Sequence, residues 1–569
     1  MPPSALFGDS AIDAARPIRV VVVGAGFSGI TTAIRLLQRV PNIKLTIYEA
    51  YAGVGGTWFS NKYPGIACDI PSHCYQLSFF QKTDWSSFYA PGHEIQAYLQ
   101  SAVDAYKLWP YIKLEHRLTN AIYSEETGKW NLTIQYGNAE QFDDTADILI
   151  TAMGALSRWK WPDIKGLDSF TGKIMHSANW EADKGEGAWE DSWKDKRVGV
   201  IGVGSSAIQI VPALQPKVGH LINYVRGKTW VSPTFLGNRA GELGMGKTES
   251  NCTSTYVFTD KDKEQYKDPM FYKEFRRDLE SDLNSIHVVT LKGNALQEIG
   301  KAAFKEDMLQ RLSARPLIAE RLIPEFSPGC RRLTPGPGYL EALCTDNVEF
   351  NSTEIKQILP TGIETVDGKV DELDVIVCAT GFDTSYKPRF PIVGRGGVKL
   401  ADKYTPHAKH YLSVAIDGFP NWFQVMGPNS AVGSGSLLIV IERQVDYIVE
   451  ATLKLQREHL KSMEVKVEAV EDWDAYIEHH FKQTVFSEKC RSWYKQGGEE
   501  GRVVALWPGS CLHAARALEH PRWEDYNYEY LEGHTNRFFW AGNGTTVAEE
   551  TAGADKAWYL SEVDVPPLS

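Results

Sequence analysis

The stretch R-V-V-V-V-G-A-G-F-S-G, from Arg19 to Gly29, decides the fold of this 569-residue chain. Its first half is a β-branched run typical of a buried parallel strand, and its second half is a G-x-G-x-x-G turn. Residues 30–40 then have the apolar spacing of a helix, and a second candidate strand at 44–50 closes with Glu49. Strand, glycine turn, helix, strand and acid in this order predict a dinucleotide-binding module.

Each glycine of this turn has a physical task. Gly24 makes the tight turn, Gly26 lets the backbone approach a pyrophosphate, and Gly29 lets the helix pack close to the strand. The phosphate charge is favoured at the helix N-terminus, and the carboxylate of Glu49 can accept hydrogen bonds from ribose hydroxyls. The residues expected to bind the first cofactor are therefore Gly24, Gly26, Phe27, Ser28 and Glu49.

The pattern recurs in R-V-G-V-I-G-V-G-S-S-A, from Arg197 to Ala207, with alanine in place of the third glycine. The strand that follows at 221–225 is closed by Arg226 and not by an acid. A carboxylate there would repel a 2′-phosphate, whereas an arginine would pair with it. The first site therefore suits FAD and the second suits NADPH. The residues expected to bind NADPH in this module are Gly202, Gly204, Ser205, Ser206, Gln209, Arg226 and Gly227.

The two modules also close alike, with similar strand and glycine sequences at 146–154 and 373–381, each preceded by a hairpin-like stretch. The second module is longer, and its extra segment at 240–328 is charged and helical in period. We therefore expect an α/β fold: two Rossmann-like dinucleotide-binding domains with β-meander insertions, plus a helical insertion in the second. The expected division is 16–158 (FAD-binding domain, first part), 159–190 (interdomain linker), 191–239 (NADP-binding domain, first part), 240–328 (helical insertion), 329–383 (NADP-binding domain, second part) and 384–569 (FAD-binding domain, second part, and C-terminal region).

Composition narrows the class of protein. The net charge of −12 argues against a nucleic-acid partner. No secretory signal is evident and no apolar run is long enough to span a membrane. The eight cysteines are too few for a disulfide framework in a chain of this length. We expect a cytoplasmic enzyme that acts on a small molecule, and the sequence leaves the oligomeric state open.

A third motif lies between the two modules, F-T-G-K-I-M-H-S-A-N-W at 170–180. In that place, F-x-G-x-x-x-H-x-x-x-W resembles the fingerprint of the Baeyer–Villiger monooxygenases, within the class B flavin-dependent monooxygenases. The resemblance extends from about Arg19 to Tyr530. It implies an FAD-containing, NADPH- and O2-dependent enzyme that converts ketones to esters or lactones through a C4a-peroxyflavin.

The resemblance also implies roles for further residues. The stretches G-V-G-G-T-W at 53–58 and Y-P-G-I-A-C-D at 63–69 look like the family's flavin loop, and C-R-R-L at 330–333 looks like its active-site arginine segment. S-W-Y at 492–494 resembles the mobile loop whose tryptophan closes over the nicotinamide nucleotide. By these matches the catalytic residues are Arg332 and Asp69, and the further cofactor-binding residues are Gly56, Thr57, Trp58, Asp69, Ile70, Tyr75, Leu437, Arg331 and Trp493.

The chemistry of these residue types agrees with those roles. The guanidinium of Arg332 cannot deprotonate, so it can stabilise an anionic oxygen, and Asp69 can hold it by a bidentate pair. His176, within the 170–180 motif, is better explained as a structural residue that forms hydrogen bonds to backbone between the domains than as a general base.

Three alternatives remain open from the sequence. A class B monooxygenase that oxidises nitrogen or sulfur would not require the arginine. A pyridine-nucleotide disulfide reductase needs a redox cysteine pair, for which only Cys68 and Cys74 lie near the first module, at an unsuitable spacing. A non-catalytic NADP sensor would keep the fold without turnover.

Overall fold

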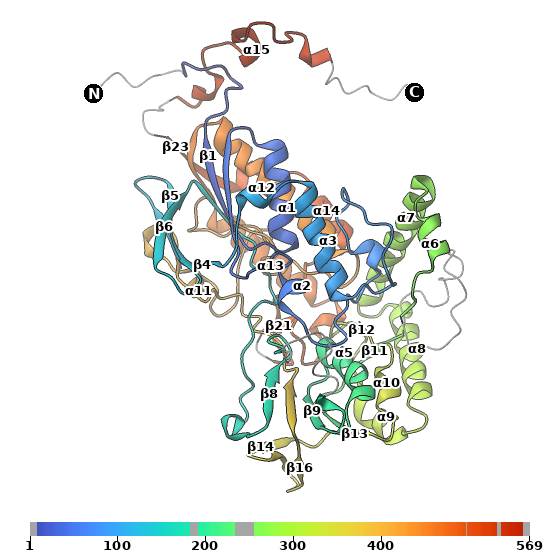
Figure 1. The fold of residues 1–569 in the computed structure, drawn as a ribbon. Coiled ribbons are helices and arrows are strands. Elements are labelled where there is room, and N and C mark those ends of the chain that lie inside the picture. Colours follow the sequence, from blue (N-terminus) through green and yellow to red (C-terminus); the bar gives the residue numbers. More distant parts are fainter. Residues whose placement is uncertain (1–7, 182–191, 234–254, 497, 532–535, 561–569) are drawn as a thin grey trace.

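The structure is a computed structural model that describes residues 8–181, 192–233, 255–496, 498–531 and 536–560. The end of the expected linker (182–190) and the start of the expected insertion (240–254) lie outside these ranges. Two parallel sheets, one above the other in Figure 1, organise the chain.

The first sheet has the quoted stretch at its centre. Its strands, in the order β19-β7-β1-β2-β3, are Trp422–Gln424, Ile148–Thr151, Ile18–Val23, Ile43–Tyr48 and Ile112–Lys113, and all its pairings are parallel. Helices α1 (Phe27–Arg39) and α12 (Leu437–Arg457) pack against each other. Because β1 is covered on both faces, Val20, Val21 and Val22 are fully buried.

The second sheet repeats this plan. Its strands, in the order β13-β10-β9-β17-β8, are Val348–Asn351, His220–Tyr224, Arg197–Ile201, Val375–Cys378 and Lys173–His176, again all parallel. Helices α5 (Ser205–Leu214) and α10 (Tyr339–Ala342) pack against each other beside it. The two Rossmann-like domains predicted from the glycine turns are thus confirmed, while β8, the edge strand formed by the 170–180 motif, was not predicted.

Each sheet has an antiparallel meander inserted before one of its strands, β7 in the first and β17 in the second, as the hairpin-like stretches predicted. The first comprises β4 (His116–Ser124), β5 (Lys129–Tyr136) and β6 (Gln141–Ala146), with β18 (Ile392–Val393) beside β4. The second comprises β14 (Ile355–Leu359), β15 (Gly362–Thr365) and β16 (Val370–Glu372).

The helical insertion in the second domain is present. Its helices are α6 (Asp260–Gln265), α7 (Pro269–Ser285), α8 (Ala295–Arg311) and α9 (Pro316–Leu322), shown in light green in Figure 1. Local sequence sets their starts, because Thr259, Asp268 and Asn294 accept N-capping hydrogen bonds at the first three helices. Strands β11 (Val231–Ser232) and β12 (Thr334–Pro335) pair where the insertion leaves and rejoins the domain.

The first part of the chain also contains α2 (Thr57–Ser60) and α3 (Gly92–Ala105), between β2 and β3. After the second domain the chain returns to the first sheet, and its remaining elements are α11 (Leu400–Lys403), β20 (Leu460–Val465), α13 (Val467–Phe481), β21 (Lys495–Gln496), β22 (Arg502–Val503), α14 (Cys511–Ala517), β23 (Tyr526–Tyr530) and α15 (Val547–Glu550). The segment with α15 lies against the start of the chain, where the Ile12 amide donates to the Thr545 carbonyl over 3.0 Å (Figure 1). Among the described residues, no helix combines the length and the apolar character needed to cross a membrane.

Candidate active site

The first glycine turn is shaped by close backbone contacts. Gly24 has a φ of +108°, and a Cβ there would lie 2.5 Å from the carbonyl oxygen of Ala152. A Cβ on Gly29 would lie 1.8 Å from the Gly24 carbonyl oxygen, so helix α1 could not pack this close with any other residue. Gly26 caps α1 without a side-chain partner, which leaves the first amides of the helix available to a phosphate.

A second glycine loop faces this turn. Gly56 has a φ of +55°, and a Cβ there would lie 2.9 Å from the Cα of Gly26. The helix that starts at Thr57 then places Trp58, whose indole N–H donates to the Tyr75 hydroxyl over 3.2 Å. The two bare backbones form a cradle of the kind that a dinucleotide needs, and the cradle gathers most of the residues expected at the first site.

Glu49 is buried at the end of β2 and faces the turn. Its carboxylate accepts from the Ala25 amide over 2.7 Å and from the Tyr51 amide over 2.8 Å. Burial raises the pKa of Glu49, and these backbone hydrogen bonds oppose that rise. The acid predicted from the strand–turn–helix pattern is therefore fixed beside the glycine turn.

The second glycine turn repeats this geometry, since Gly202 has a φ of +132° and a Cβ there would lie 2.4 Å from the Ala379 carbonyl oxygen. Ser205 begins α5 and pairs with Thr334 through their hydroxyls at 2.6 Å. Gln209, which was expected to bind NADPH, already has hydrogen-bond partners within the protein. Its amide is engaged within the protein, donating to the Ala67 carbonyl and accepting from the Tyr63 hydroxyl, both over 2.9 Å. Gln209 therefore joins the second domain to the flavin-type loop of the first.

Basic residues gather at the end of β10. Arg226 and Lys228 are exposed there, and the Arg331 guanidinium donates to the Lys228 carbonyl over 2.6 Å. Burial lowers the pKa of Arg331, and the neighbouring charge of Arg491 acts in the same direction. The fold thus places the Arg331 guanidinium beside the stretch that follows β10 and contains Arg226, about a hundred positions earlier in the sequence.

The two residues expected to be catalytic form a bidentate pair. The Arg332 Nε donates to Asp69 Oδ2 over 2.8 Å and its Nη2 donates to Oδ1 over 2.7 Å. Asp69 belongs to the loop of the first domain, whereas Arg332 lies just after the insertion of the second. Burial lowers the pKa of Arg332, but Asp69 and Tyr494 outweigh burial and raise it overall. The guanidinium is therefore a permanent positive charge at the contact between the domains.

Tyr494 is a site residue that the sequence analysis did not single out. It is buried, it interacts with the charge of the Arg332 side chain, and its ring lies 4.6 Å from that of Trp493. Burial raises the pKa of Tyr494 and Arg332 opposes this rise, so the phenol stays protonated at neutral pH. Its position next to Trp493 in the S-W-Y stretch was the only signal in the sequence.

His176 has the surroundings of a structural residue. Its ring stacks on Trp159 at 4.6 Å, its Nδ1 accepts from the Ala178 amide over 3.1 Å, and its Nε2 lies 3.3 Å from the Thr380 hydroxyl. Burial lowers the pKa of His176 to about 4, so the ring is neutral. A Cβ on Gly172 would lie 2.4 Å from the Asp374 carbonyl oxygen, so the motif also provides a close approach of β8 to the sheet.

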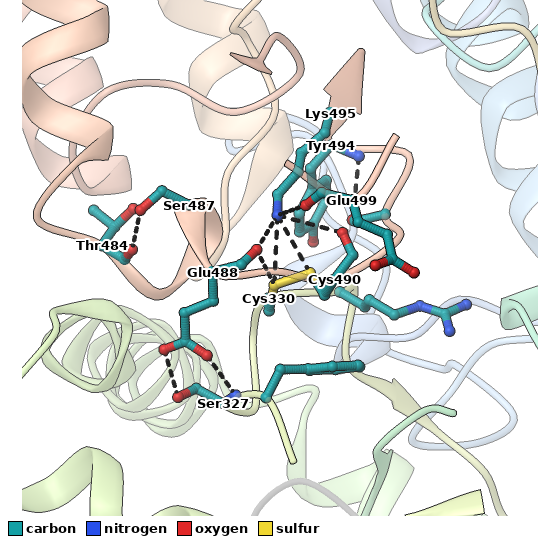
Figure 2. Close-up of a disulfide and its surroundings, with 12 residues drawn as sticks. Ser327, Cys330, Thr484, Ser487, Glu488, Cys490, Tyr494, Lys495 and Glu499 are labelled. Carbon is teal, nitrogen blue, oxygen red and sulfur yellow. Dashed lines mark hydrogen bonds between the residues drawn. A yellow bond between two sulfur atoms is a disulfide. The ribbon is translucent and has the colours of Figure 1, made fainter. Parts of the chain in front are cut away.

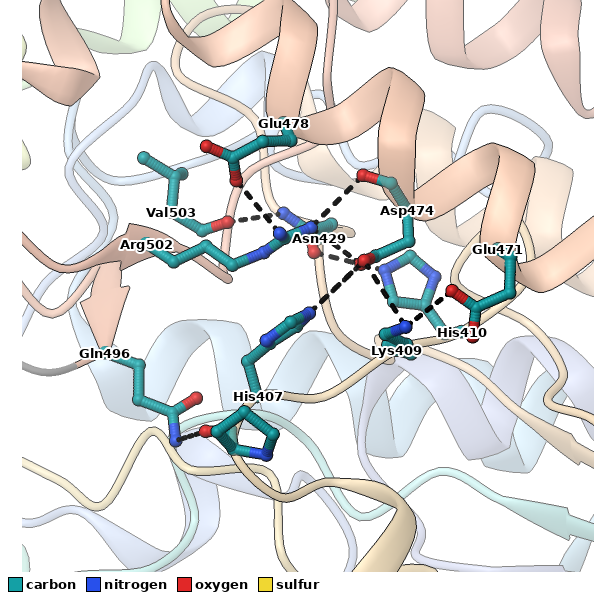
Figure 3. A network of polar contacts seen from close by, with 11 residues as sticks. His407, Lys409, His410, Asn429, Glu471, Asp474, Glu478, Gln496, Arg502 and Val503 are labelled. Atoms are coloured by element: carbon teal, nitrogen blue, oxygen red, sulfur yellow. Dashed lines mark hydrogen bonds and ion pairs between the residues drawn. The ribbon is translucent and has the colours of Figure 1, made fainter.

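The turn before α12 is held by a buried polar network (Figure 3). The Asn429 amide donates to the carbonyls of Val503 and Leu506 over 3.1 and 2.8 Å, and its Oδ1 lies 3.1 Å from the His410 ring. Leu437, expected to contact the flavin, is the first residue of α12. The network therefore links the turn before α12 to β22.

The cysteines do not support a redox pair in the first domain. Cys68 and Cys74 are free and buried, and burial raises the pKa of both thiols. A disulfide joins Cys330 to Cys490 instead, which the cysteine count did not anticipate (Figure 2). Among the described residues, the redox pair expected of a disulfide reductase is therefore not found near the first glycine turn.

Comparisons with known proteins agree with this geometry. Residues 22–90 match the family of NAD(P)-binding Rossmann-like domains. The chain is 40% identical to the FAD-binding monooxygenase tazF of Aspergillus terreus over 550 residues, and this alignment covers 96% of this chain and 95% of that protein. It is 32% identical to a Baeyer–Villiger monooxygenase of Pseudomonas aeruginosa over 499 residues, and this alignment covers 87% of this chain and 88% of that protein. The chain belongs to the Baeyer–Villiger monooxygenase family.

Solved structures extend this likeness to three dimensions. The chain resembles a crystal structure of cyclohexanone monooxygenase from Rhodococcus sp. Phi1 bound to NADP+, with a TM-score of 0.76 and 26% identity over 91% of this chain and 100% of that one. It also resembles an oxidized steroid monooxygenase bound to NADP, with a TM-score of 0.74 and 27% identity over 90% and 100%. Nearly the whole of this Baeyer–Villiger monooxygenase therefore shares the fold of structurally known relatives.

Proposed function

We propose that this chain is an FAD-containing, NADPH- and O2-dependent monooxygenase that converts ketones to esters or lactones through a C4a-peroxyflavin. The observation that carries the proposal is the Asp69–Arg332 pair. It fixes a permanent positive charge from the second domain against the flavin-type loop of the first, where an anionic oxygen needs stabilisation.

The two cradles support the choice of cofactors. Gly24, Gly26 and Gly56 leave room for the FAD pyrophosphate, and Glu49 lies beside them for the ribose. The second turn, with the cluster at Arg226 and Arg331, suits NADPH because a 2′-phosphate needs cationic partners. When bound, the flavin supplies the redox and oxygen chemistry, and the protein supplies binding, orientation and electrostatics.

The role proposed for Arg332 follows from its donors. A guanidinium has five N–H donors, and Asp69 engages two of them. Tyr494 lies beside the same guanidinium, whose remaining donors can stabilise negative charge that develops on a reacting oxygen. Asp69, Arg332 and Tyr494 come from three separate parts of the chain, so the orientation of the charge is set before substrate binds and costs no reorganisation during the reaction.

The division of the chain into domains is also part of the proposal. Strand β19 pairs with β7 and α12 packs on α1, which supports assigning 16–158 and 384–569 to one FAD-binding domain. The second sheet supports assigning 191–239 and 329–383 to the NADP-binding domain, although β8 of the proposed linker 159–190 pairs with β17 of this sheet.

The direct test is product analysis under labelled oxygen. The purified holoenzyme is incubated with NADPH, a panel of cyclic and aryl ketones, and ¹⁸O2. The proposal predicts an ester or lactone that carries one ¹⁸O atom, with one NADPH consumed per product. Oxygenation of sulfides or amines without any ketone product would contradict the ketone assignment. Hydrogen peroxide as the only product of every substrate would contradict monooxygenation.

A further inference from the structure

Lys495 places a charged group inside the protein next to the active site. The residue is buried, and its ammonium donates to the backbone carbonyls of Glu488, Cys490 (3.3 Å) and Glu499 (2.9 Å). These three carbonyls match the three donors of an ammonium group. Within the part of the chain that the structure describes, no carboxylate lies close enough to Lys495 for an ion pair. Backbone carbonyls, rather than a counter-ion, therefore hold the charge (Figure 2).

The same ammonium lies against the disulfide. Its nitrogen is 3.6 Å from the Cys490 sulfur and 3.8 Å from the Cys330 sulfur. The disulfide itself joins segments that are 160 residues apart in the chain. Figure 2 shows the ammonium, the two sulfur atoms and the carbonyls grouped around one point.

A third connection joins the same two segments. The Glu488 carboxylate accepts from the Ser327 amide over 2.8 Å and from the Ser327 hydroxyl over 2.7 Å. The segment 327–332 and the segment 485–495 are thus linked by the disulfide, by the Glu488–Ser327 pair and by the Lys495 contacts. We call this set of connections the clasp.

The residues of the clasp are direct neighbours in sequence of the proposed active-site residues. Cys330 immediately precedes Arg331 and Arg332, and Lys495 immediately follows Trp493 and Tyr494. The two segments held together are therefore those that present the guanidinium and the aromatic side chains proposed to act on the cofactors. Tyr494 contacts the Arg332 side chain directly, so a shift of one segment relative to the other would change the surroundings of the guanidinium.

We propose that Lys495 is a positioning residue: with the Cys330–Cys490 disulfide, it fixes the Trp493–Tyr494 turn to the Arg331–Arg332 segment, so that the two segments move as one unit. This inference rests on the proposed function for its effect on turnover. It also makes a structural claim that holds whatever the substrate is. Lys495 touches neither Asp69 nor Arg332 among the contacts of the structure, and it acts on the site through the backbone of its own segment and through the disulfide.

The first test replaces the charge and keeps the length of the side chain. Lys495→Met leaves three buried carbonyls without a donor, so the turn should lose its fixed position. Misplacement of catalytic groups by about 1 Å can cost about 100-fold in rate, and we expect kcat for ketone oxygenation to fall by about 10- to 100-fold. The KM for NADPH should change far less, because the Arg226–Arg331 cluster is retained, and more NADPH should be oxidised without product.

The matched control is Lys489→Met, in the same segment. Lys489 is exposed and lies 3.7 Å from Glu500, so its loss should leave kcat and coupling unchanged. Equal effects of the two substitutions, or an unchanged kcat in Lys495→Met, would overturn the proposal.

A second measurement needs no variant and no ketone. Treating the wild-type holoenzyme with a small dithiol transfers two electrons and two protons to the Cys330–Cys490 bond, giving two thiols and the oxidised reagent, which mass spectrometry of the two peptides verifies. Amide hydrogen exchange should then rise together in 327–333 and 490–496. Faster exchange confined to one segment would overturn the proposal.

The two measurements separate this inference from the proposed function. If the wild-type enzyme oxygenates no ketone, the proposed function fails, but the exchange experiment still decides whether the segments are coupled. Reduction and Lys495→Met should also be non-additive, since both release the same connection. Additive losses of kcat would mean that Lys495 acts independently of the disulfide and would refute the single unit.

Discussion

Replacing Asp69 with asparagine tests how the active-site charge is held. Asparagine has nearly the shape of aspartate but presents one oxygen acceptor and one NH2 group to the Arg332 guanidinium. Of the two hydrogen bonds, at 2.8 and 2.7 Å, one is therefore lost and the other is weakened. The guanidinium stays charged, but its orientation is no longer fixed by a fork of two bonds.

The expected magnitude follows from these two bonds. A hydrogen bond to a charged group contributes about 1.5–3 kcal/mol. About a quarter of each side chain is exposed, 27% for Arg332 and 26% for Asp69, so water replaces part of the lost contact. The lower end of that range, about 1.5 kcal/mol, then applies. A loss of this size corresponds to a fall of about tenfold in the rate of any step that needs Arg332 in place.

Stopped-flow kinetics can assign the loss to one half of the reaction. Reduction of the flavin by NADPH, measured without oxygen, should be nearly unchanged because neither glycine turn involves Asp69. Ester formation should fall by about tenfold.

The matched control is Glu341→Gln, which breaks a similar bidentate pair to Arg311 (2.7 and 3.0 Å) in the insertion and should leave ester formation unchanged. Ester formation at the wild-type rate in Asp69→Asn, or an equal loss in the control, would refute the reasoning.

Two further predictions concern cofactor choice and acid stability. Arg226→Ala should raise the KM for NADPH and leave that for NADH little changed, because the lost charge faces only a 2′-phosphate; steady-state kinetics with both cofactors checks this, and equal effects would refute it. Burial lowers the pKa of His410 from 6.5 to about 4, and the hydrogen bond to Asn429 opposes this fall. The ring is therefore neutral at neutral pH, and its Nδ1 accepts from the Ser413 amide over 2.9 Å. The stability that neutral His410 contributes is complete above about pH 6.5 and is lost as pH falls towards about 4. At about pH 5 the loss amounts to about 2 kcal/mol. The drop in Tm between neutral pH and about pH 5 should therefore be smaller in His410→Gln than in the wild type, and an equal drop would contradict the assignment.

The parts of the fold that the sequence predicted are those fixed by short-range geometry. The turns at Gly24 and Gly202 need positive φ and close backbone contact, and those demands are met within a few residues of one strand and one helix. Helices α6, α7 and α8 of the insertion begin at residues of the types that cap helices, Thr259, Asp268 and Asn294. Local chemistry of this kind does not depend on the rest of the chain.

The parts that were missed depend on residues far apart in the chain. The 170–180 motif was interpreted as a linker because its pattern does not show that β8 pairs with β17, two hundred residues later. Cysteine counting could not pair Cys330 with Cys490, because pairing follows from spatial proximity. The acceptors around the Lys495 ammonium are backbone carbonyls. Every residue type has such a carbonyl, so the sequence does not reveal these contacts.

The Asp69–Arg332 pair lies between these cases. The residue types and the bidentate geometry follow from chemistry, but the partners are 263 positions apart and came together in the sequence analysis only through family resemblance. Tyr494 shows the limit of that approach, since it lies within the S-W-Y stretch and beside the same guanidinium, yet the resemblance assigns a role only to its neighbour Trp493.

The measurement that tests the central claim most directly is a pulse of O2 delivered to enzyme that NADPH has reduced anaerobically, with absorbance followed across the near-UV. The account predicts a long-lived peroxyflavin band in the wild-type enzyme that decays faster when a ketone is added and yields an ester. In Arg332→Ala the band should still form, but the ketone should neither accelerate its decay nor be converted. Immediate reoxidation of the wild-type flavin with stoichiometric hydrogen peroxide and no oxygenated product would contradict the account.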